Sequence, residues 1–215
     1  MKIDQLFLDL DGTLYSTNGN GMWSDIAARM GTYMHEEIGI PKDQVLETRL
    51  QYFLEYGTTL RGLMANHEID PLHFLAYVHD VPVSSYLKPD ERLREMLIGI
   101  PRPKWILTNS DIPHATRVLN TLKLFDLFED ILDITRMDFL NKPNPLVFQR
   151  ALEISGNPAP ENCMFVDDIP HNLTPAKQLG LVTVLVGEKP DNGSADYHIQ
   201  DIYALGDLFA EISNG

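Results

Sequence analysis

The sequence predicts an α/β fold, a doubly wound parallel sheet with an inserted all-helical cap, from two observations. Residues 6–8 and 10 are apolar, as expected for a strand that is buried on both faces. From about residue 89 onward, short apolar runs alternate with amphipathic helical patterns, which is typical of parallel strands joined by helical crossovers. Between these regions the periodicity is only helical, so we expect a helical unit directly after the first strand.

The inserted unit covers residues 16–88 and begins with a flexible link that contains Gly19 and Gly21. Apolar residues then recur at spacings of three and four, the pattern of helices that bury one face. Gly57 ends the second of these patterns, and Pro71 stands in the first turn of the last. The expected helices lie near residues 22–38, 45–56, 58–64 and 70–74.

Residues 1–15 and 89–215 are expected to form a Rossmann-like core in which strands and helices alternate. Right-handed crossovers between parallel strands would cover both faces of the sheet with helices. The helices are expected at 90–98, 113–122, 145–155, 172–179 and from about 205, and the strands at 104–107, 131–134, 163–166, 182–186 and near 197–199.

The chain is acidic, because 31 Asp and Glu residues against 17 Lys and Arg give a formal charge of −14. No run of Lys or Arg stands out, which argues against nucleic acid polymers and anionic membrane surfaces as partners. A small anionic substrate must therefore be attracted locally, by a metal, a single lysine or oriented backbone N–H groups. We expect a monomer or a small homo-oligomer.

Cys163 is the only cysteine among the 215 residues, so no disulfide can form within the chain. Its apolar neighbours indicate a strand, and we interpret it as a core residue rather than a nucleophile. Acidic residues interrupt the N-terminal apolar run, unlike in a signal peptide, and nowhere do about 18 apolar residues follow one another. The cytoplasm is the expected compartment.

Polar side chains gather where the strands of the predicted sheet end. In a doubly wound sheet, ligands bind outside the carboxyl ends of the strands, at the point where the strand order reverses. Gly12 adds a turn after the first strand whose backbone N–H groups would face an anion. The side chains at these ends are Asp9 and Asp11, then Thr108, Asn109, Ser110 and Asp111, then Asp167 and Asp168, with Lys142 in the loop before the 145–155 helix.

These groups suit a phosphoryl group held against Mg²⁺, because they combine carboxylates, a hydroxyl, an amide and one cation. Taken alone, Thr108, Asn109 and Lys142 are better explained as a strand end, a turn and a solvated lysine. Asp167 and Asp168 are harder to explain in that way, since adjacent carboxylates after an apolar strand repel each other unless a cation compensates them.

The order of these motifs resembles the four-motif signature of the haloacid dehalogenase-like hydrolase superfamily. A second set of segments is similar to the pyrimidine 5′-nucleotidase-like branch of that superfamily. The first set is residues 9–14 (DLDGTL), 106–109 (ILTN), Lys142-Pro143 and 165–168 (FVDD). The second set is residues 56–63 (YGTTLRGL), 86–90 (YLKPD), 109–115 (NSDIPHA) and 184–187 (VLVG).

The resemblance implies a phosphomonoesterase that acts through an aspartyl-phosphate. Asp9 would attack phosphorus, and Asp11 would protonate the leaving alcohol and then activate water. Lys142 would neutralise the phosphate and the nucleophile, while Thr108 and Asn109 would bind phosphoryl oxygens.

The resemblance also implies a Mg²⁺ site. Asp9 and the backbone carbonyl of Asp11 would bind the ion. Asp168 aligns best with the remaining ligand of the family, and Asp167 would lie beside it, either as a ligand or in contact with one.

The inserted helices would form a cap that selects the substrate, with Tyr56, Thr58, Thr59 and Arg61 as candidate contacts to the leaving group. An alternative is that Thr58 caps a helix and Tyr56 packs inside the cap. By the cap resemblance, the expected substrate is a nucleoside 5′-monophosphate, with a pyrimidine base favoured.

Other classes stay open at this point. A phosphatase for a sugar phosphate, a phosphomutase or a phosphonatase would use much the same core. A phospho-accepting signalling module also combines acidic residues, a Thr and a Lys, but such modules place the phosphorylated Asp on a later strand. Dehalogenation is disfavoured, because a halide leaving group needs no acid at Asp11. Dinucleotide binding is disfavoured because no strand is followed by Gly-x-Gly-x-x-Gly.

Overall fold

A computed structural model describes residues 2–19, 21–188 and 193–214. Its centre is a six-stranded sheet with the order β3-β2-β1-β4-β5-β6, in which all neighbouring strands pair in parallel. This is the strand order of a doubly wound Rossmann-like sheet, and it confirms the predicted fold class. The strands are β1 (Gln5–Leu8), β2 (Lys104–Leu107), β3 (Asp130–Leu132), β4 (Cys163–Asp167), β5 (Val182–Val186) and β6 (Tyr197–Ile199).

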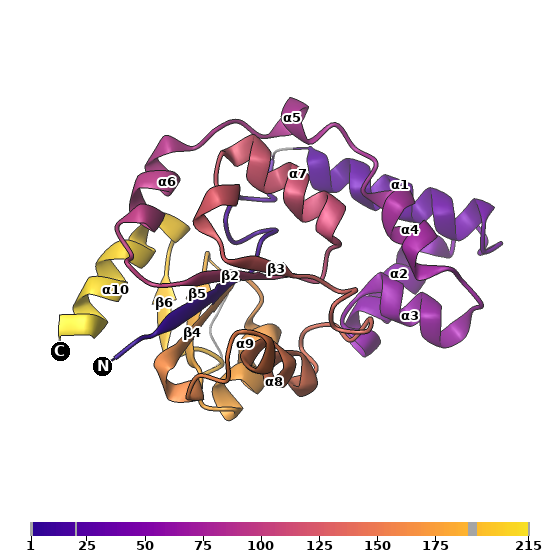
Figure 1. The fold of residues 1–215 in the computed structure, drawn as a ribbon. Helices are drawn as coiled ribbons and strands as arrows, with labels where there is room; N and C mark the ends of the chain where they lie inside the picture. The colour runs from indigo at the N-terminus through magenta and orange to yellow at the C-terminus, as the bar shows by residue number, and fades with distance from the viewer. Residues whose placement is uncertain (1, 20, 189–192, 215) are drawn as a thin grey trace.

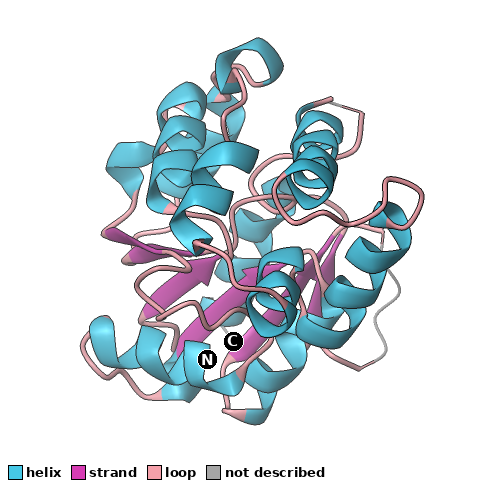
Figure 2. Cartoon of the chain, turned by 90° about the vertical axis from the view of Figure 1, so that its right-hand side faces the viewer, coloured by secondary structure: helices cyan, strands magenta, loops and turns pink. Residues whose placement is uncertain are grey.

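The two faces of the sheet bury alternate residues of each strand, because successive side chains point to opposite faces. Leu6 and Leu8 of β1 pack into one apolar cluster, with residues of α6, α7 and α10. Phe7, between them, packs into a second cluster with residues of α8 and α9. Figures 1 and 2 show the sheet between these two layers of helices. The helices are α6 (Glu91–Ile98), α7 (Ile112–Leu122), α8 (Pro145–Ile154), α9 (Pro170–Gln178) and α10 (Leu205–Asn214), with short 3₁₀ turns η1 (Phe125–Leu127), η2 (Pro160–Asn162) and η3 (Ile202–Ala204).

In the part of the chain that the structure describes, five helices lie between β1 and α6, and the first four gather beside the sheet in Figure 1. A third apolar cluster holds them together, centred on Tyr33, Leu63, Phe74 and Val78, and it reaches Ile134 of the core. These helices are α1 (Met22–Glu36), α2 (Val45–Tyr56), α3 (Thr59–Asn66), α4 (Pro71–Val78) and α5 (Val83–Tyr86). The division into a core and a separate cap at residues 15/16 and 88/89 remains a prediction.

Short polar side chains begin several of these helices by accepting hydrogen bonds from the first free N–H groups. Asp70 accepts from the N–H groups of Leu72 and His73 at the start of α4. Thr58 accepts from the N–H of Arg61 at the start of α3. These contacts explain why the helix starts could be located closely from the sequence.

The structure adds short elements that the sequence did not indicate, namely the single turn of α5 and the 3₁₀ turns η1, η2 and η3. Such turns are shorter than the repeat from which helical periodicity is recognised. Cys163 is fully buried in β4, as expected for a core residue. Among the described residues, no helix is both long and apolar enough to cross a membrane.

Candidate active site

The strand order brings the distant aspartates together. β1 lies between β2 and β4, so the strand order reverses at β1 and a ligand site is expected at the carboxyl ends of these strands. Asp9 directly follows β1, and its N–H donates to Val166 O at 2.9 Å. Asp167 is the last residue of β4 and is completely buried.

Lys142 is the cation at the centre of this cluster. It is 1% exposed, and its Nζ donates to Asp9 Oδ1 at 2.7 Å, to Asp167 Oδ2 at 2.8 Å and to the Leu107 carbonyl at 2.7 Å. Burial alone would lower the pKa of Lys142, but the two carboxylates outweigh burial and raise that pKa above its ordinary value. The lysine is therefore held in its charged form.

Asp9, Asp167 and Asp168 form the candidate metal site. One carboxylate oxygen from each lies within 4.8 Å of the others. Burial raises the pKa of Asp9 well above its ordinary value, with Lys142 opposing and the other two aspartates adding to the rise. Three carboxylates against one ammonium leave an excess of negative charge, and hard oxygen ligands suit Mg²⁺, so these residues fit the ion.

Gly12 provides a second observation that fits such a site. Its φ is +94°, and a Cβ at this position would lie 2.8 Å from the carboxyl atoms of Asp168. Only glycine therefore lets the turn after β1 approach the Asp168 carboxylate so closely. The predicted contact of Gly12 with an anionic substrate remains a prediction.

Asp11 accepts three hydrogen bonds. Ser110 Oγ donates at 2.7 Å, His114 Nε2 lies at 2.9 Å, and the Tyr15 hydroxyl donates to the same Oδ1 as His114. Burial alone would raise the pKa of Asp11, but His114, Tyr15 and Ser110 together lower it well below its ordinary value. In this arrangement Asp11 is held in its ionised form.

His114 belongs to a buried pair of imidazoles at the junction of α4 and α7. Its ring stacks on that of His79 with centroids 4.4 Å apart. His79 Nδ1 lies 2.9 Å from Asp111 Oδ1, which also accepts from the His114 N–H at the start of α7. This contact links the segment after α4 to the helix that positions His114 against Asp11.

Thr108 and Asn109 follow β2, and both line a cavity that also contains Asp9 and Asp11. The Asn109 amide donates to the Lys142 carbonyl at 3.1 Å and accepts from the Lys142 N–H at 2.8 Å, so it holds the backbone that carries the lysine. Thr108 Oγ1 accepts from the Ser110 N–H at 3.0 Å. The predicted contacts of both residues with phosphoryl oxygens remain predictions.

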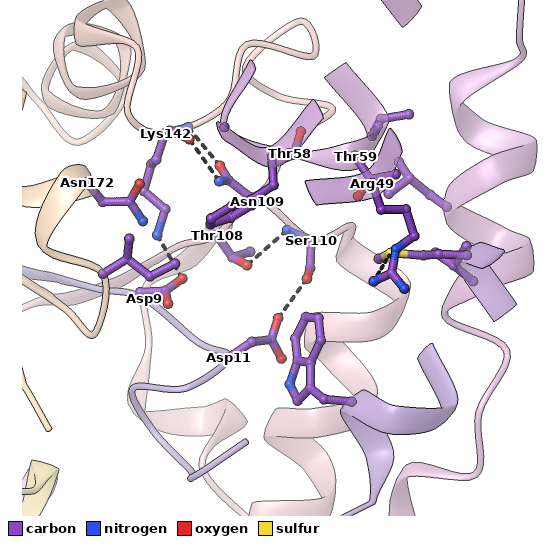
Figure 3. A pocket seen from close by; sticks show the side chains of 18 of the residues that line it. Asp9, Asp11, Arg49, Thr58, Thr59, Thr108, Asn109, Ser110, Lys142 and Asn172 are labelled. Atoms are coloured by element: carbon purple, nitrogen blue, oxygen red, sulfur yellow. Dashed lines mark hydrogen bonds and ion pairs between the residues drawn. The ribbon is translucent and has the colours of Figure 1, made fainter. Parts of the chain in front are cut away.

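A cavity of about 530 Å³ opens over Asp9 and Asp11 (Figure 3). Its walls come from the core loops and from α1 to α4. Of the predicted site residues, Asp9, Asp11, Thr58, Thr59, Thr108, Asn109 and Lys142 line it. Gly12, Tyr56, Arg61, Asp167 and Asp168 are not among the described residues that line it.

The four predicted cap contacts thus divide into two pairs. Thr58 and Thr59 line the cavity, and Thr58 also caps α3. Tyr56 instead packs edge to face on Tyr52, and its carbonyl accepts from Asn141 at 3.0 Å. Contact of Tyr56 or Arg61 with a leaving group stays a prediction.

Several residues of the site were missed in the sequence. Asn172 donates to both oxygens of Asp167 at 3.1 Å, and His114 Nε2 lies 2.9 Å from Asp11 Oδ1. Ser110 was expected at this strand end, but its hydrogen bond to Asp11 was not. A signal existed for His114, a histidine on the apolar face of its helix. No comparable signal marked Arg49, an α2 residue that also lines the cavity.

A family model of the haloacid dehalogenase-like hydrolases matches residues 3–180. The chain belongs to this family. Phosphate metabolism protein 8 of Saccharomyces cerevisiae is 31% identical over an alignment of 193 positions, which covers 83% of this chain and 60% of the yeast protein. The chain therefore spans less than two thirds of that relative.

Solved structures of the family share the fold. A β-phosphoglucomutase from Clostridium difficile superposes with a TM-score of 0.64 at 21% identity, covering 99% of this chain and 97% of that one. A HAD-hydrolase from Bacillus subtilis bound to magnesium gives a TM-score of 0.61 at 18% identity, covering 97% and 99%. At these identities the likeness establishes the architecture only.

Proposed function

We propose that the chain is a Mg²⁺-dependent phosphomonoesterase that acts through an aspartyl-phosphate intermediate. The observation that carries the proposal is the buried arrangement of Asp9, in contact with Lys142 and close to Asp167 and Asp168, at the floor of a cavity that also contains Asp11. This set supplies a nucleophile, a fixed cation, an acid/base and a cluster of oxygen ligands.

In the first step, Asp9 attacks phosphorus and the bond between phosphorus and the ester oxygen breaks. A proton from Asp11 goes to the leaving alcohol, for which Asp11 must first be protonated, and the charge of the bound phosphoryl group favours that by raising its pKa. In the second step, Asp11 takes a proton from water, and the water oxygen displaces Asp9 from phosphorus. Inorganic phosphate leaves and Asp9 is restored.

Lys142 holds Asp9 in place and places a positive charge next to the developing phosphoryl charge. Asp9, Asp168 and the backbone carbonyl of Asp11 would hold Mg²⁺, with Asp167 beside them. When bound, the ion supplies charge neutralisation at the phosphoryl oxygens. Asn172 and Lys142 share Asp167, which fixes that carboxylate at the edge of the cluster.

For the substrate, we propose a nucleoside 5′-monophosphate with a pyrimidine base. The cap motifs of the pyrimidine 5′-nucleotidase-like branch support this choice. The cavity volume of about 530 Å³ is also within the range of sites that enclose small ligands. A panel of nucleotides and sugar phosphates tests it, and a strong preference for sugar phosphates would refute it.

The chemical proposal predicts the effect of Asp9→Asn. Because the amide is a far weaker nucleophile than the carboxylate, hydrolysis of p-nitrophenyl phosphate with Mg²⁺ should fall at least about a thousandfold. Asp43→Asn serves as the control, since Asp43 is exposed and remote from the cavity lining. Full activity in a folded Asp9→Asn variant would rule out the aspartyl-phosphate route.

A further inference from the structure

Arg49 is a half-buried cation in the wall of the active-site cavity. It lies on α2, away from the four motifs, and Figure 3 shows its side chain extending into the pocket. Arg49 and Lys142 are the Lys or Arg side chains among the described residues that line this cavity. Lys142 is occupied by Asp9 and Asp167, so Arg49 is the cation that faces the rest of a substrate.

The hydrogen bonding of Arg49 is incomplete. Its Nη1 donates to the Ala27 carbonyl at 3.0 Å, and Nη2 contacts Met30 Sδ at 3.8 Å. Neither partner is a carboxylate. The Nε atom is buried and has no hydrogen-bond partner among the described residues. Burial lowers the pKa of Arg49, which reports the cost of holding a cation there. An acceptor on a bound ligand would remove that cost.

The side chains around Arg49 restrict which chemical groups could bind next to it. Aromatic and aliphatic side chains form most of the nearby cap wall, which suits a flat group with few polar atoms. Asp9 and Asp11 lie in the same cavity and would repel a second anionic group on the substrate. A neutral acceptor oxygen meets both conditions. The apolar lining residues of the cap are Trp23, Met30, Phe53, Leu54, Leu60, Phe74, Leu75 and Val78.

We infer that Arg49 determines substrate specificity by donating a guanidinium N–H to a ring carbonyl oxygen of the leaving group, as the pyrimidine bases of UMP and CMP carry. The apolar wall packs on the faces of that ring. This inference rests on the proposed phosphomonoesterase activity. It names the side chain that would make the enzyme prefer pyrimidine nucleotides. Adenine has no ring carbonyl, and ribose 5-phosphate has no base, so Arg49 contributes little to either.

The experiment compares wild-type protein with Arg49→Met on UMP, CMP, AMP, ribose 5-phosphate and p-nitrophenyl phosphate with Mg²⁺. Methionine keeps the length and apolar stem but removes every N–H donor. Because a hydrogen bond from a charged donor is lost, kcat/KM for UMP and CMP should fall about 10- to 100-fold, mainly through KM. The other three substrates should change less than about threefold. Lys42→Met removes the same charge from an exposed cap position and should change none of them.

The possible results distinguish a failure of the role of Arg49 from a failure of the proposed phosphomonoesterase activity. An equal loss on all five substrates, or no loss on UMP and CMP, overturns the role of Arg49 while the phosphatase activity stands. Hydrolysis of p-nitrophenyl phosphate without hydrolysis of UMP or CMP also overturns it. No hydrolysis of any substrate by wild-type protein overturns the proposed function and this inference together. A melting curve of each variant separates unfolding from a change of selectivity, because unfolding lowers all five rates alike.

Discussion

Lys142 shows how much of the site depends on single side chains. In the sequence it is one lysine before a proline, whereas in the fold it is buried with three oxygen partners at the carboxyl ends of β1, β2 and β4. Removing one partner of such a buried ion pair leaves the others uncompensated. Asp11 is similar, because its ionisation depends on Ser110 and His114 and not on its own strand.

Cys163 allows a test at the residue scale. Burial raises the pKa of its thiol to about 11. At pH 8 only about one thiol in a thousand would be ionised, against roughly a quarter of an unfolded cysteine. Iodoacetamide should therefore modify the native protein at least about 100-fold more slowly than the protein in concentrated urea.

The labelling rate of native protein should rise with pH between 8 and 10, because the thiolate fraction rises as pH approaches the raised pKa. Mass spectrometry of quenched samples measures both rates. Rapid labelling of native protein at pH 8 would contradict the buried position of Cys163.

At the scale of elements, α2 and α3 form the wall of the cavity and must pack closely to do so. Gly62 of α3 lies against Tyr52 of α2, and a Cβ at Gly62 would lie 2.2 Å from the tyrosine ring. Glycine at this position therefore serves close helix packing, at some cost in intrinsic helix stability. The close approach also sets the position of Thr58 and Thr59, which begin α3 at the edge of the cavity.

Gly62→Ala tests this packing. The added methyl group must displace a buried tyrosine, so the free energy of unfolding should fall by about 1–3 kcal/mol in urea titrations. Gly31→Ala in α1 is the matched control, since its Cβ would meet only Val45 at 3.4 Å. There the gain in helix propensity should leave stability unchanged or raise it by up to about 1 kcal/mol. Equal stability of the two variants would contradict the close contact of α2 with α3.

At the scale of the whole molecule, the chain has a formal charge of −14, so a cluster of carboxylates adds to charge repulsion that is already present. Three of the carboxylates are concentrated at the switch point of the sheet, where they repel one another. A bound divalent cation should therefore stabilise the entire fold. The strand order brings these carboxylates together, because β1 and β4 are neighbours in the sheet. In the chain, more than 150 residues separate Gln5 of β1 from Cys163 of β4.

Magnesium should raise the melting temperature of the EDTA-treated protein. At a concentration 100 times the dissociation constant, binding contributes about 2.7 kcal/mol, which corresponds to a shift of several degrees for a chain of this size. Asp168→Asn should remove most of the shift, and Glu36→Gln, at an exposed position of α1, should keep it. A shift of the same size in all three proteins would mean that Mg²⁺ binds elsewhere.

Local patterns predicted the elements well, and the reason is physical. The expected boundaries of α2, β2 and β5 agree with the structure, because helix and strand periodicity and terminal glycines act within a few residues. The aspartates were found because carboxylates after buried strands conflict with an apolar environment. The contact of His114 with Asp11 was not predicted from the sequence, because the two residues lie 103 positions apart in the chain.

The sequence by itself determined the doubly wound sheet, the order of its motifs and the residues that carry charge at the strand ends. These features depend on short-range periodicity and on the cost of burying charge, and both are readable from neighbours in the chain. Only the tertiary structure decided which residues of the inserted helices line the cavity. Arg49 lines the cavity and Arg61 does not, because the packing of α2 on α1 and α3 sets which side of each helix meets the core.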